Sequence, residues 1–188
     1  TFYRGHILKE GIKVAIAGIP NVGKSSLLNL LSGHDRAIVT DIPGTTRDTI
    51  EESIDYEGIP IILTDTAGLR ETSDAVEKIG VDRSYEVIQN SDIVVFMADI
   101  SDSVQAARSK ELLDEIKTKI ESDKNILVVL NKSDIEQREA SAVFGEYAVK
   151  MSVKENRGAE VLLEKIKEDE VFFRDDGGVT FSGGAPLM

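Results

Sequence analysis

The octapeptide Gly18-Ile-Pro-Asn-Val-Gly-Lys-Ser25 constrains the fold of this chain more than any other part of its sequence. It has the pattern G-x-x-x-x-G-K-S, it follows an apolar, strand-like run at 12–17, and it opens a helix-like run at 25–31. The N-terminus of a helix offers unpaired backbone N–H groups and a positive dipole end to anions such as phosphate. The strand, the loop and the helix together predict a phosphate-binding loop (P-loop) in an α/β domain.

Each position in the predicted P-loop has an expected role toward a nucleotide. Gly23 removes the Cβ where the backbone must approach phosphate oxygens closely. Lys24 is expected to place its charge on the β- and γ-phosphates, and the Ser25 hydroxyl is expected to bind Mg²⁺. The loop residues expected to contact the nucleotide are Asn21, Val22, Gly23, Lys24, Ser25 and Ser26. The alternative is an ordinary glycine-containing turn between a strand and a helix.

Strand-like and helix-like runs alternate through most of the chain. The strand-like runs lie at 12–17, 49–56, 59–64, 93–98, 126–130 and 147–151, and the helix-like runs at 25–31, 79–89, 104–120 and 159–167. Such alternation is typical of crossovers that leave neighbouring strands parallel, whereas the second and third runs form a hairpin turned at Glu57-Gly58. We expect a Ras-like P-loop α/β fold, with a mostly parallel six-stranded sheet, one antiparallel edge strand and helices on both faces.

Composition argues against several classes of function. The net charge of −12 disfavours nucleic-acid binding by this chain alone, because clustered Lys and Arg drive binding to the phosphate backbone. The absence of cysteine excludes disulfides and thiolate metal sites, and it fits a reducing cytoplasm. Apolar runs such as 93–98 are much shorter than the roughly 20 residues that a membrane span needs. We therefore expect a cytoplasmic protein without a membrane partner.

A polar motif, Asn131-Lys-Ser-Asp134, follows the strand-like run at 126–130. The carboxyl ends of parallel strands form the edge where such sheets bind ligands. A carboxylate there can accept hydrogen bonds from the ring N1–H and the exocyclic amine of guanine, whereas adenine offers neither donor. Asp134 is therefore expected to select guanine, with Asn131 and Lys132 bracing the pocket. Taken alone, the motif could be a polar loop.

Met151-Ser-Val-Lys154 follows the next strand-like run and is expected to reach the same base. Backbone N–H groups of Ser152 and Val153, together with the stem of Lys154, are the expected contacts. Without the motif at Asn131–Asp134, this four-residue pattern would indicate a base site only weakly.

Two further segments complete an ordered set of motifs. In Asp65-Thr-Ala-Gly68, Asp65 can hold a Mg²⁺-bound water, and Gly68 leaves its N–H free to approach the γ-phosphate. Upstream, Thr45 and Thr46 lie in Gly44-Thr-Thr-Arg-Asp48, where a hydroxyl could reach Mg²⁺ only when the γ-phosphate is present. The order of the four motifs predicts a domain that binds and hydrolyses GTP.

One component that many GTPases have is missing. They carry a glutamine directly after D-x-x-G to orient the attacking water, but this chain has Leu69, whose side chain cannot form hydrogen bonds. Either hydrolysis is slow or another group orients the water. The polar candidates in the following stretch are Arg70, Glu71, Asp74, Glu77 and Lys78.

Three segments carry a resemblance to a known family. They are Gly18-Ile-Pro-Asn-Val-Gly-Lys-Ser-Ser-Leu-Leu-Asn29, Thr40-Asp-Ile-Pro-Gly-Thr-Thr-Arg-Asp48 and Asp65-Thr-Ala-Gly-Leu-Arg-Glu-Thr-Ser-Asp-Ala-Val-Glu-Lys-Ile-Gly80. Together they resemble the G domain of the MnmE (TrmE) family of tRNA-modification GTPases, over roughly residues 12–167. The first two segments are shared with the related Era and EngA proteins, so the third one discriminates.

The resemblance implies K⁺-activated GTP hydrolysis and homodimerisation of G domains across their switch faces. The family's K⁺ ligands map onto the Asn21 side chain and onto the backbone carbonyls of Thr40 and Ile42. A K⁺ ion beside the phosphates would supply the positive charge that an arginine finger supplies in other GTPases. The Mg²⁺-binding switch threonine maps onto Thr46.

The same resemblance offers an answer to the missing glutamine. The family glutamate that orients the attacking water through a bridging water maps onto Glu77. The catalytic candidates are therefore Glu77 and Lys24, with Arg70 retained from the polar stretch after D-x-x-G.

The resemblance also places the chain within a longer protein. Members of the family modify the wobble uridine of certain tRNAs together with a flavoprotein, MnmG (GidA), and their G domain is inserted in a helical domain. Residues 1–10 are thus expected to lead in from that missing domain, 11–170 to form the G domain, and 171–188 to form a flexible tail. MnmG and tRNA would be contacted through the missing domains.

Three alternatives stay open on the sequence. One is a ribosome-assembly GTPase of the Era/EngA type, and another is a GTP-gated interaction switch with low turnover, for which Leu69 is the main argument. A P-loop kinase that uses ATP is the third.

Overall fold

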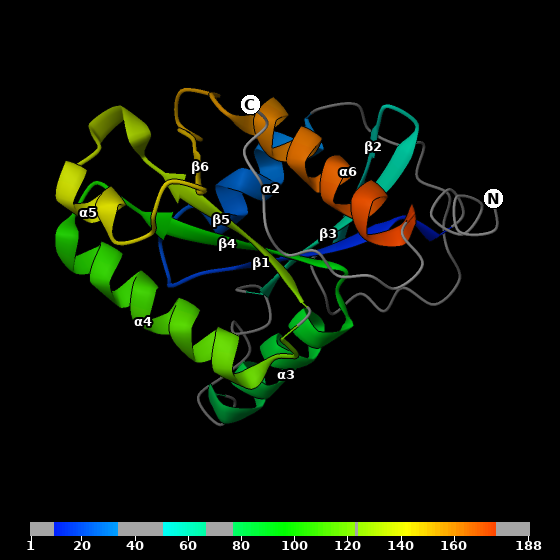
Figure 1. Cartoon of the computed structure of the whole chain (residues 1–188), viewed down its shortest axis with the longest axis horizontal. Coiled ribbons are helices and arrows are strands. Elements are labelled where there is room, and N and C mark those ends of the chain that lie inside the picture. Colours follow the sequence, from blue (N-terminus) through cyan, green and yellow to red (C-terminus); the bar gives the residue numbers. More distant parts are fainter. Residues whose placement is uncertain (1–9, 34–50, 67–76, 123, 176–188) are drawn as a thin grey trace.

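The computed structural model describes residues 10–33, 51–66, 77–122 and 124–175, which form a sheet covered by helices on both faces (Figure 1). The strands are β1 (Ile12–Ala17), β2 (Glu51–Tyr56), β3 (Ile59–Asp65), β4 (Ile93–Asp99), β5 (Asn125–Asn131) and β6 (Val149–Lys150). The helices are α2 (Lys24–Ser32), α3 (Glu77–Asn90), α4 (Ser103–Lys119), α5 (Arg138–Ala142) and α6 (Ala159–Asp175), with a short 3₁₀ turn, η2 (Ser133–Ile135).

The strand order confirms the predicted fold class. Within the described residues, six strands lie in the order β2-β3-β1-β4-β5-β6. Strands β3, β1, β4, β5 and β6 run parallel, and β2 joins antiparallel at the edge. Helical crossovers make neighbouring strands parallel, whereas the tight turn between β2 and β3 makes that pair antiparallel. The carboxyl ends of the parallel strands therefore meet at one edge of the sheet.

Two apolar layers hold the sheet between the helices. On one face, α2 and α6 pack against β1, β3 and β4, and on the other face α3, α4 and α5 pack against β1, β4 and β5 (Figure 1). All seven residues of β4 are buried, as expected for a central strand covered on both faces. No helix in the described ranges is both long and apolar enough to cross a lipid bilayer.

The last helix and the last strand differ from the expectations. A helix was expected at 159–167, but α6 continues to Asp175, so the first residues of the expected tail at 171–188 are helical. The sequence contains no proline or glycine to end the helix before Gly177. The strand expected at 147–151 is reduced to β6, which pairs only with Val129 and Leu130 of β5. Residues 1–9 of the expected lead-in at 1–10, and residues 176–188 of the expected tail, lie outside the described residues.

The β2–β3 hairpin is tied to α6 at its turn. Glu57 and Gly58 both have positive φ, at 51° and 82°, which is typical of a tight hairpin. The hydroxyl of Tyr56 donates to Oε1 of Glu164 at 2.6 Å, and this hydrogen bond to a carboxylate raises the pKa of Tyr56 to about 12. At the other end of the hairpin, Asp65 ends β3 beside β1, which places it next to the loop that follows β1.

Candidate nucleotide site

The loop between β1 and α2 has the backbone geometry that the glycine pattern predicts. Gly23 precedes α2 with a φ of 107°, a conformation that residues with a Cβ rarely adopt. A Cβ at this position would lie 2.6 Å from Nδ2 of Asn131, so the site has no room for one. Position 23 therefore requires glycine because a β5 side chain crowds it, whereas the expected close approach to phosphate oxygens stays a prediction.

Lys24 is held by its own loop. Its Nζ donates to the carbonyl oxygens of Gly18 and Ile19, at 2.7 Å each, and the residue is 6% exposed. These two bonds hold the ammonium group inside the curve of the loop. The first turn of α2 contains no acidic residue, so its positive dipole end is not offset by a carboxylate of that turn.

Ser25 and Asp65 converge from different elements. The Ser25 hydroxyl donates to Oδ2 of Asp65 at 3.0 Å, and Asp65 is buried at the end of β3. The next residue, Thr66, donates from Oγ1 to the carbonyl of Ile16 at 2.8 Å, which fixes the end of β3 against β1. A hydroxyl and a carboxylate oxygen are suitable ligands for Mg²⁺, which needs only one or two protein oxygens beside phosphates and water. The described residues contain no cluster of three or more His, Cys, Asp or Glu suited to a metal.

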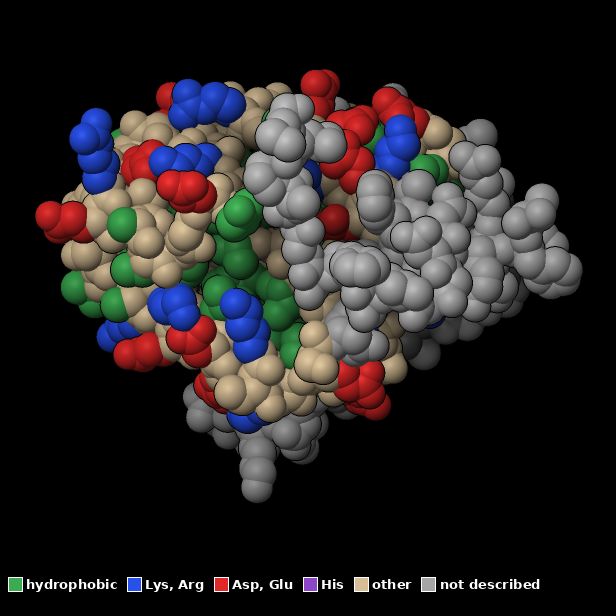
Figure 2. All heavy atoms as spheres, viewed as in Figure 1, with side chains coloured by type: hydrophobic (Ala, Val, Ile, Leu, Met, Phe, Trp, Pro, Cys, Tyr) green, Lys and Arg blue, Asp and Glu red, His purple; other side chains and the backbone are tan. Residues whose placement is uncertain are grey.

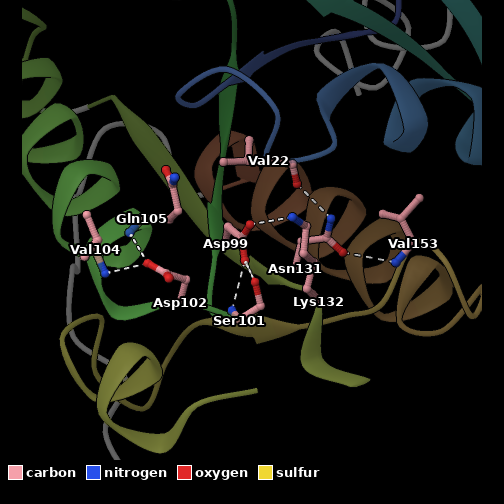
Figure 3. Close-up of polar contacts among 9 residues, drawn as sticks. All are labelled: Val22, Asp99, Ser101, Asp102, Val104, Gln105, Asn131, Lys132 and Val153. Carbon is pink, nitrogen blue, oxygen red and sulfur yellow. Dashed lines mark hydrogen bonds and ion pairs between the residues drawn. The ribbon is translucent and has the colours of Figure 1, made fainter. Parts of the chain in front are cut away.

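Asn131 connects the P-loop to the segment after β6 (Figure 3). Its Nδ2 donates to the carbonyl of Val22 at 2.8 Å, and its Oδ1 accepts from the backbone N–H of Val153 at 3.1 Å. The residue is 4% exposed, and the bond to Val22 is buried whereas the bond from Val153 is partly buried. Asn131 therefore braces two loops at once, which is more than the sequence motif alone indicates.

Asp134 is positioned by Ser152, which lies in the segment Met151–Lys154 that was predicted to reach the base. The Ser152 hydroxyl donates to Oδ1 of Asp134 at 2.7 Å. This hydrogen bond lowers the pKa of Asp134, and the charges of Lys154 and Arg157 act in the same direction. The side chain is therefore a carboxylate at neutral pH and acts only as a hydrogen-bond acceptor.

Lys132 has a strained backbone and a buried partner. Its φ of 66° lies in the left-handed region, which costs a residue with a side chain roughly 1–2 kcal/mol. Its Nζ contacts Oδ2 of Asp99 at 2.5 Å (Figure 3). Asp99 also accepts from the backbone N–H and the hydroxyl of Ser101, at 2.9 and 2.6 Å. Burial alone would raise the pKa of Asp99, but the hydrogen bonds from Lys132 and Ser101 lower it below its ordinary value.

A cavity of about 680 Å³ lies against the P-loop. Lys24 and Ser25 line one part of it, and α3 and α4 line the other with residues that include Tyr85 and Glu115. The hydroxyl of Tyr85 donates to Oε1 of Glu115 at 3.1 Å, which joins the two helices at this wall. The volume is within the usual range for small-molecule sites, about 300–1,000 Å³.

Comparison with known proteins identifies the family. Residues 13–132 match the model of a family described as 50S ribosome-binding GTPase. The chain belongs to this GTPase family. It is 45% identical over 177 residues to the tRNA modification GTPase MnmE of Streptococcus sanguinis, and 44% identical over 167 residues to that of Proteus mirabilis. These alignments cover 94% and 88% of the GTPase chain but only 37% of each relative, so the chain spans well under half the length of these relatives.

Solved structures agree with this assignment. The G domain of the FeoB iron transporter of T. maritima is 35% identical, with a TM-score of 0.58 over 84% of the GTPase chain and 97% of that domain. Era of Aquifex aeolicus, solved with GDP·AlF₄⁻, is 28% identical, with a TM-score of 0.60 over 83% of this chain and 56% of Era. The resemblance to MnmE G domains, the α/β fold and the prediction of a GTPase are thus confirmed.

Several predicted site residues of the GTPase are not described by the structure. Thr40, Ile42, Thr45, Thr46, Gly68, Leu69 and Arg70 lie outside the described residues. Glu77 is the first residue of α3, and its side chain is not described. Three other predicted residues are described and exposed: Asn21 in the loop after β1, Ser26 at the start of α2, and Lys154 in the loop after β6. Their roles toward a ligand stay predictions.

Sequence reasoning did not identify Asp99 of the GTPase. The signal was present, because Asp99 is an acidic residue at the end of the otherwise apolar strand Ile-Val-Val-Phe-Met-Ala-Asp. Charged residues are rarely buried without a partner, so a carboxylate at a strand end predicts a nearby cation. The cation is Lys132, in the motif that begins at the end of β5. The sequence does not identify it, because the contact depends on the pairing of β4 with β5.

Proposed function

We propose that this chain is the G domain of a larger protein that modifies the wobble uridine of tRNA, and that it hydrolyses GTP with Mg²⁺ and K⁺. The observation that carries the proposal is 45% identity to an MnmE across 94% of this chain, although the chain spans only 37% of that relative. An MnmG-like flavoprotein and tRNA would then act through other parts of the longer protein. The Era alternative has less support, because Era is 28% identical.

The proposed phosphate site uses the P-loop. Lys24 would direct its ammonium toward the β- and γ-phosphates, and the backbone N–H groups at the start of α2 would donate hydrogen bonds to oxygens of the α- and β-phosphates. The hydrogen bonds of Lys24 to Gly18 and Ile19 support this role, because they hold the charge at the loop before any ligand arrives. Such preorganisation avoids paying the ordering cost during the reaction.

The proposed base site uses the ends of β5 and β6. Asp134, oriented by Ser152, would accept hydrogen bonds from the N1–H and the 2-amino group of guanine. Asn131 would hold the base site and the P-loop in a fixed relation through Val22 and Val153. A nucleotide bound across both loops would therefore meet a P-loop and a base segment that Asn131 already joins.

Two cations fit the proposal. Mg²⁺ would be held by Ser25 and Asp65, with Thr46 as the expected switch ligand, and when bound it neutralises charge on the phosphate oxygens. K⁺ would be held by Asn21 with Thr40 and Ile42, and it would supply positive charge near the phosphates. The contact between Ser25 and Asp65 supports the Mg²⁺ assignment, whereas the K⁺ assignment rests on the family resemblance.

Replacing Asn21 by alanine is expected to remove activation by K⁺. GTP turnover in K⁺ should fall roughly 100-fold, which is the typical cost of losing one transition-state charge contact. The measurement is phosphate release in KCl and in NaCl at equal ionic strength. Asn90→Ala, at the exposed end of α3, is the matched control and should keep the K⁺ effect. Equal rates of the unaltered chain in the two salts would contradict the potassium assignment.

Glu77→Ala is expected to lower kcat about 100-fold and to leave the Kd for GDP within about twofold, because the proposed role is to orient water and not to bind nucleotide. Single-turnover hydrolysis and binding of a fluorescent GDP analogue separate the two quantities. Glu86→Ala, on the exposed part of α3, is the control. A loss of nucleotide affinity as large as the loss of kcat would show that Glu77 has a different role.

The tRNA role is tested by exchanging domains. Residues 11–170 would replace the G domain of the MnmE of Streptococcus sanguinis, and wobble-uridine modification would be measured by mass spectrometry of tRNA nucleosides in cells that lack MnmE. Restored modification is the expected result. A hybrid protein that hydrolyses GTP at the parental rate, dimerises with GDP and aluminium fluoride, and leaves the tRNA unmodified would overturn the proposal.

Surface charge agrees with a role in which this domain does not itself bind the tRNA. On the described part of the face in Figure 2, Lys and Arg side chains lie among Asp and Glu and form no basic patch.

A further inference from the structure

Asp99 is a buried carboxylate outside all four GTPase motifs. It is 5% exposed, and it ends β4 directly opposite Asn131 of β5. Its Oδ1 accepts two hydrogen bonds from Ser101, and its Oδ2 contacts Nζ of Lys132 at 2.5 Å (Figure 3). A buried carboxylate with three donors is held in one position, so its partner lysine is anchored as well.

Lys132 needs such an anchor. Its backbone adopts the left-handed conformation, with a φ of 66°, and η2 follows immediately and contains Asp134. The backbone N–H of Ser133 donates to the carbonyl of Met151 at 3.0 Å, so the same turn also meets the segment that contains Ser152. A long lysine side chain that was free to rotate would not stabilise this strained turn.

We propose that Asp99 is a positioning residue of the guanine site, which acts through Lys132 to hold the strained turn that presents Asp134. Asp99 does not contact the base. It restrains the ammonium group of Lys132, this restrains the turn at Lys132, and the turn sets the position of the Asp134 carboxylate relative to Ser152. The inference rests on the proposed base site, and it adds a specificity residue from β4 to a site otherwise formed by the end of β5 and the segments that follow β5 and β6.

The competing explanation is that the ion pair only stabilises the contact between β4 and β5. The two explanations predict different results for base discrimination. A purely structural pair would change the unfolding temperature and leave the ratio of Kd values for IDP and GDP unchanged. A positioning residue would change this ratio, because IDP lacks the 2-amino group that one oxygen of Asp134 is proposed to bind.

The test uses Asp99→Asn, which keeps an oxygen for Ser101 and turns an amide toward Lys132. The Kd for GDP should rise roughly tenfold, the IDP/GDP ratio should fall, and kcat at saturating GTP should change less than about twofold. Asp114→Asn is the matched control, since it breaks a lysine–aspartate pair on the exposed face of α4 and should leave all three quantities unchanged. An unchanged IDP/GDP ratio, or a fall in kcat alone, would overturn the proposal.

A double-mutant cycle tests the route through Lys132. Lys132→Met keeps the aliphatic stem and removes the charge, so Asp99→Asn should have no further effect on the GDP affinity in that background. The same loss in both backgrounds would show that Asp99 does not act through Lys132, and this also overturns the inference. Asp134→Asn tests the base site independently. If it leaves the IDP/GDP ratio unchanged while the unaltered chain binds GDP, the proposed base site fails irrespective of Asp99.

Discussion

Asp134→Asn is expected to weaken GTP binding about 100-fold or more and to shift the preference toward xanthosine nucleotides. Two hydrogen bonds to a charged acceptor are lost, and each is worth about 1.5–3 kcal/mol. The asparagine amide can instead donate to the 2-oxo group of xanthine, which a carboxylate would repel. Competition binding with GDP, XDP and ADP measures the change. An unchanged preference for GDP would contradict the role of Asp134, and tight ADP binding by the unaltered chain would favour the kinase alternative.

Ser152→Ala is the companion variant, and its expected effect is smaller. It removes the hydroxyl donor that is the main cause of the lowered pKa of Asp134, so the pKa should rise toward the ordinary value. The midpoint of the Asp134 carboxyl titration, followed by NMR, should therefore move to higher pH in the variant. In the unaltered chain, the lowered pKa of Asp134 stabilises the folded state above the unfolded pKa, and this stabilisation is lost as the pH falls through the folded pKa. A midpoint that does not move would show that Ser152 does not hold this carboxylate.

Lys24→Ala is expected to lower kcat/KM for GTP about 1,000-fold, because it removes a preorganised charge from the phosphates. The carbonyls of Gly18 and Ile19 also lose a donor, but the loop borders an open cavity where water can replace it. The folded state should therefore be largely retained, as measured by the unfolding temperature. Lys13→Ala, at the exposed start of β1, is the control and should hydrolyse GTP at the original rate.

Turnover within about tenfold of the original rate in Lys24→Ala would contradict this role for Lys24. Measuring single turnover at saturating enzyme separates loss of chemistry from loss of affinity. A variant that has lost its unfolding transition would assign the effect to the loop structure, and that result would also contradict the prediction.

Most of the sheet could be predicted because its signals are local. The continuous apolar run that became β4, and the glycine turn at Glu57-Gly58, indicate a buried strand and a hairpin from neighbouring residues alone. The extent of α6 was underestimated, since it depends on packing against the sheet as well as on helix propensity. The short α5 and η2 were not predicted at all, because a helix of five residues or fewer has almost no periodic pattern.

The sequence by itself determined the GTPase family, and it predicted the motifs that consecutive residues form, including the proposed phosphate loop from Gly18 to Ser25 and the proposed guanine motif ending at Asp134. Only the tertiary structure decided which distant groups support that chemistry. Asn131 bonds to Val22, 109 positions away, and Lys132 bonds to Asp99, 33 positions away. The physical reason is that parallel pairing brings the carboxyl ends of β1, β4 and β5 to one edge, and a sequence motif does not specify which side chains then meet there.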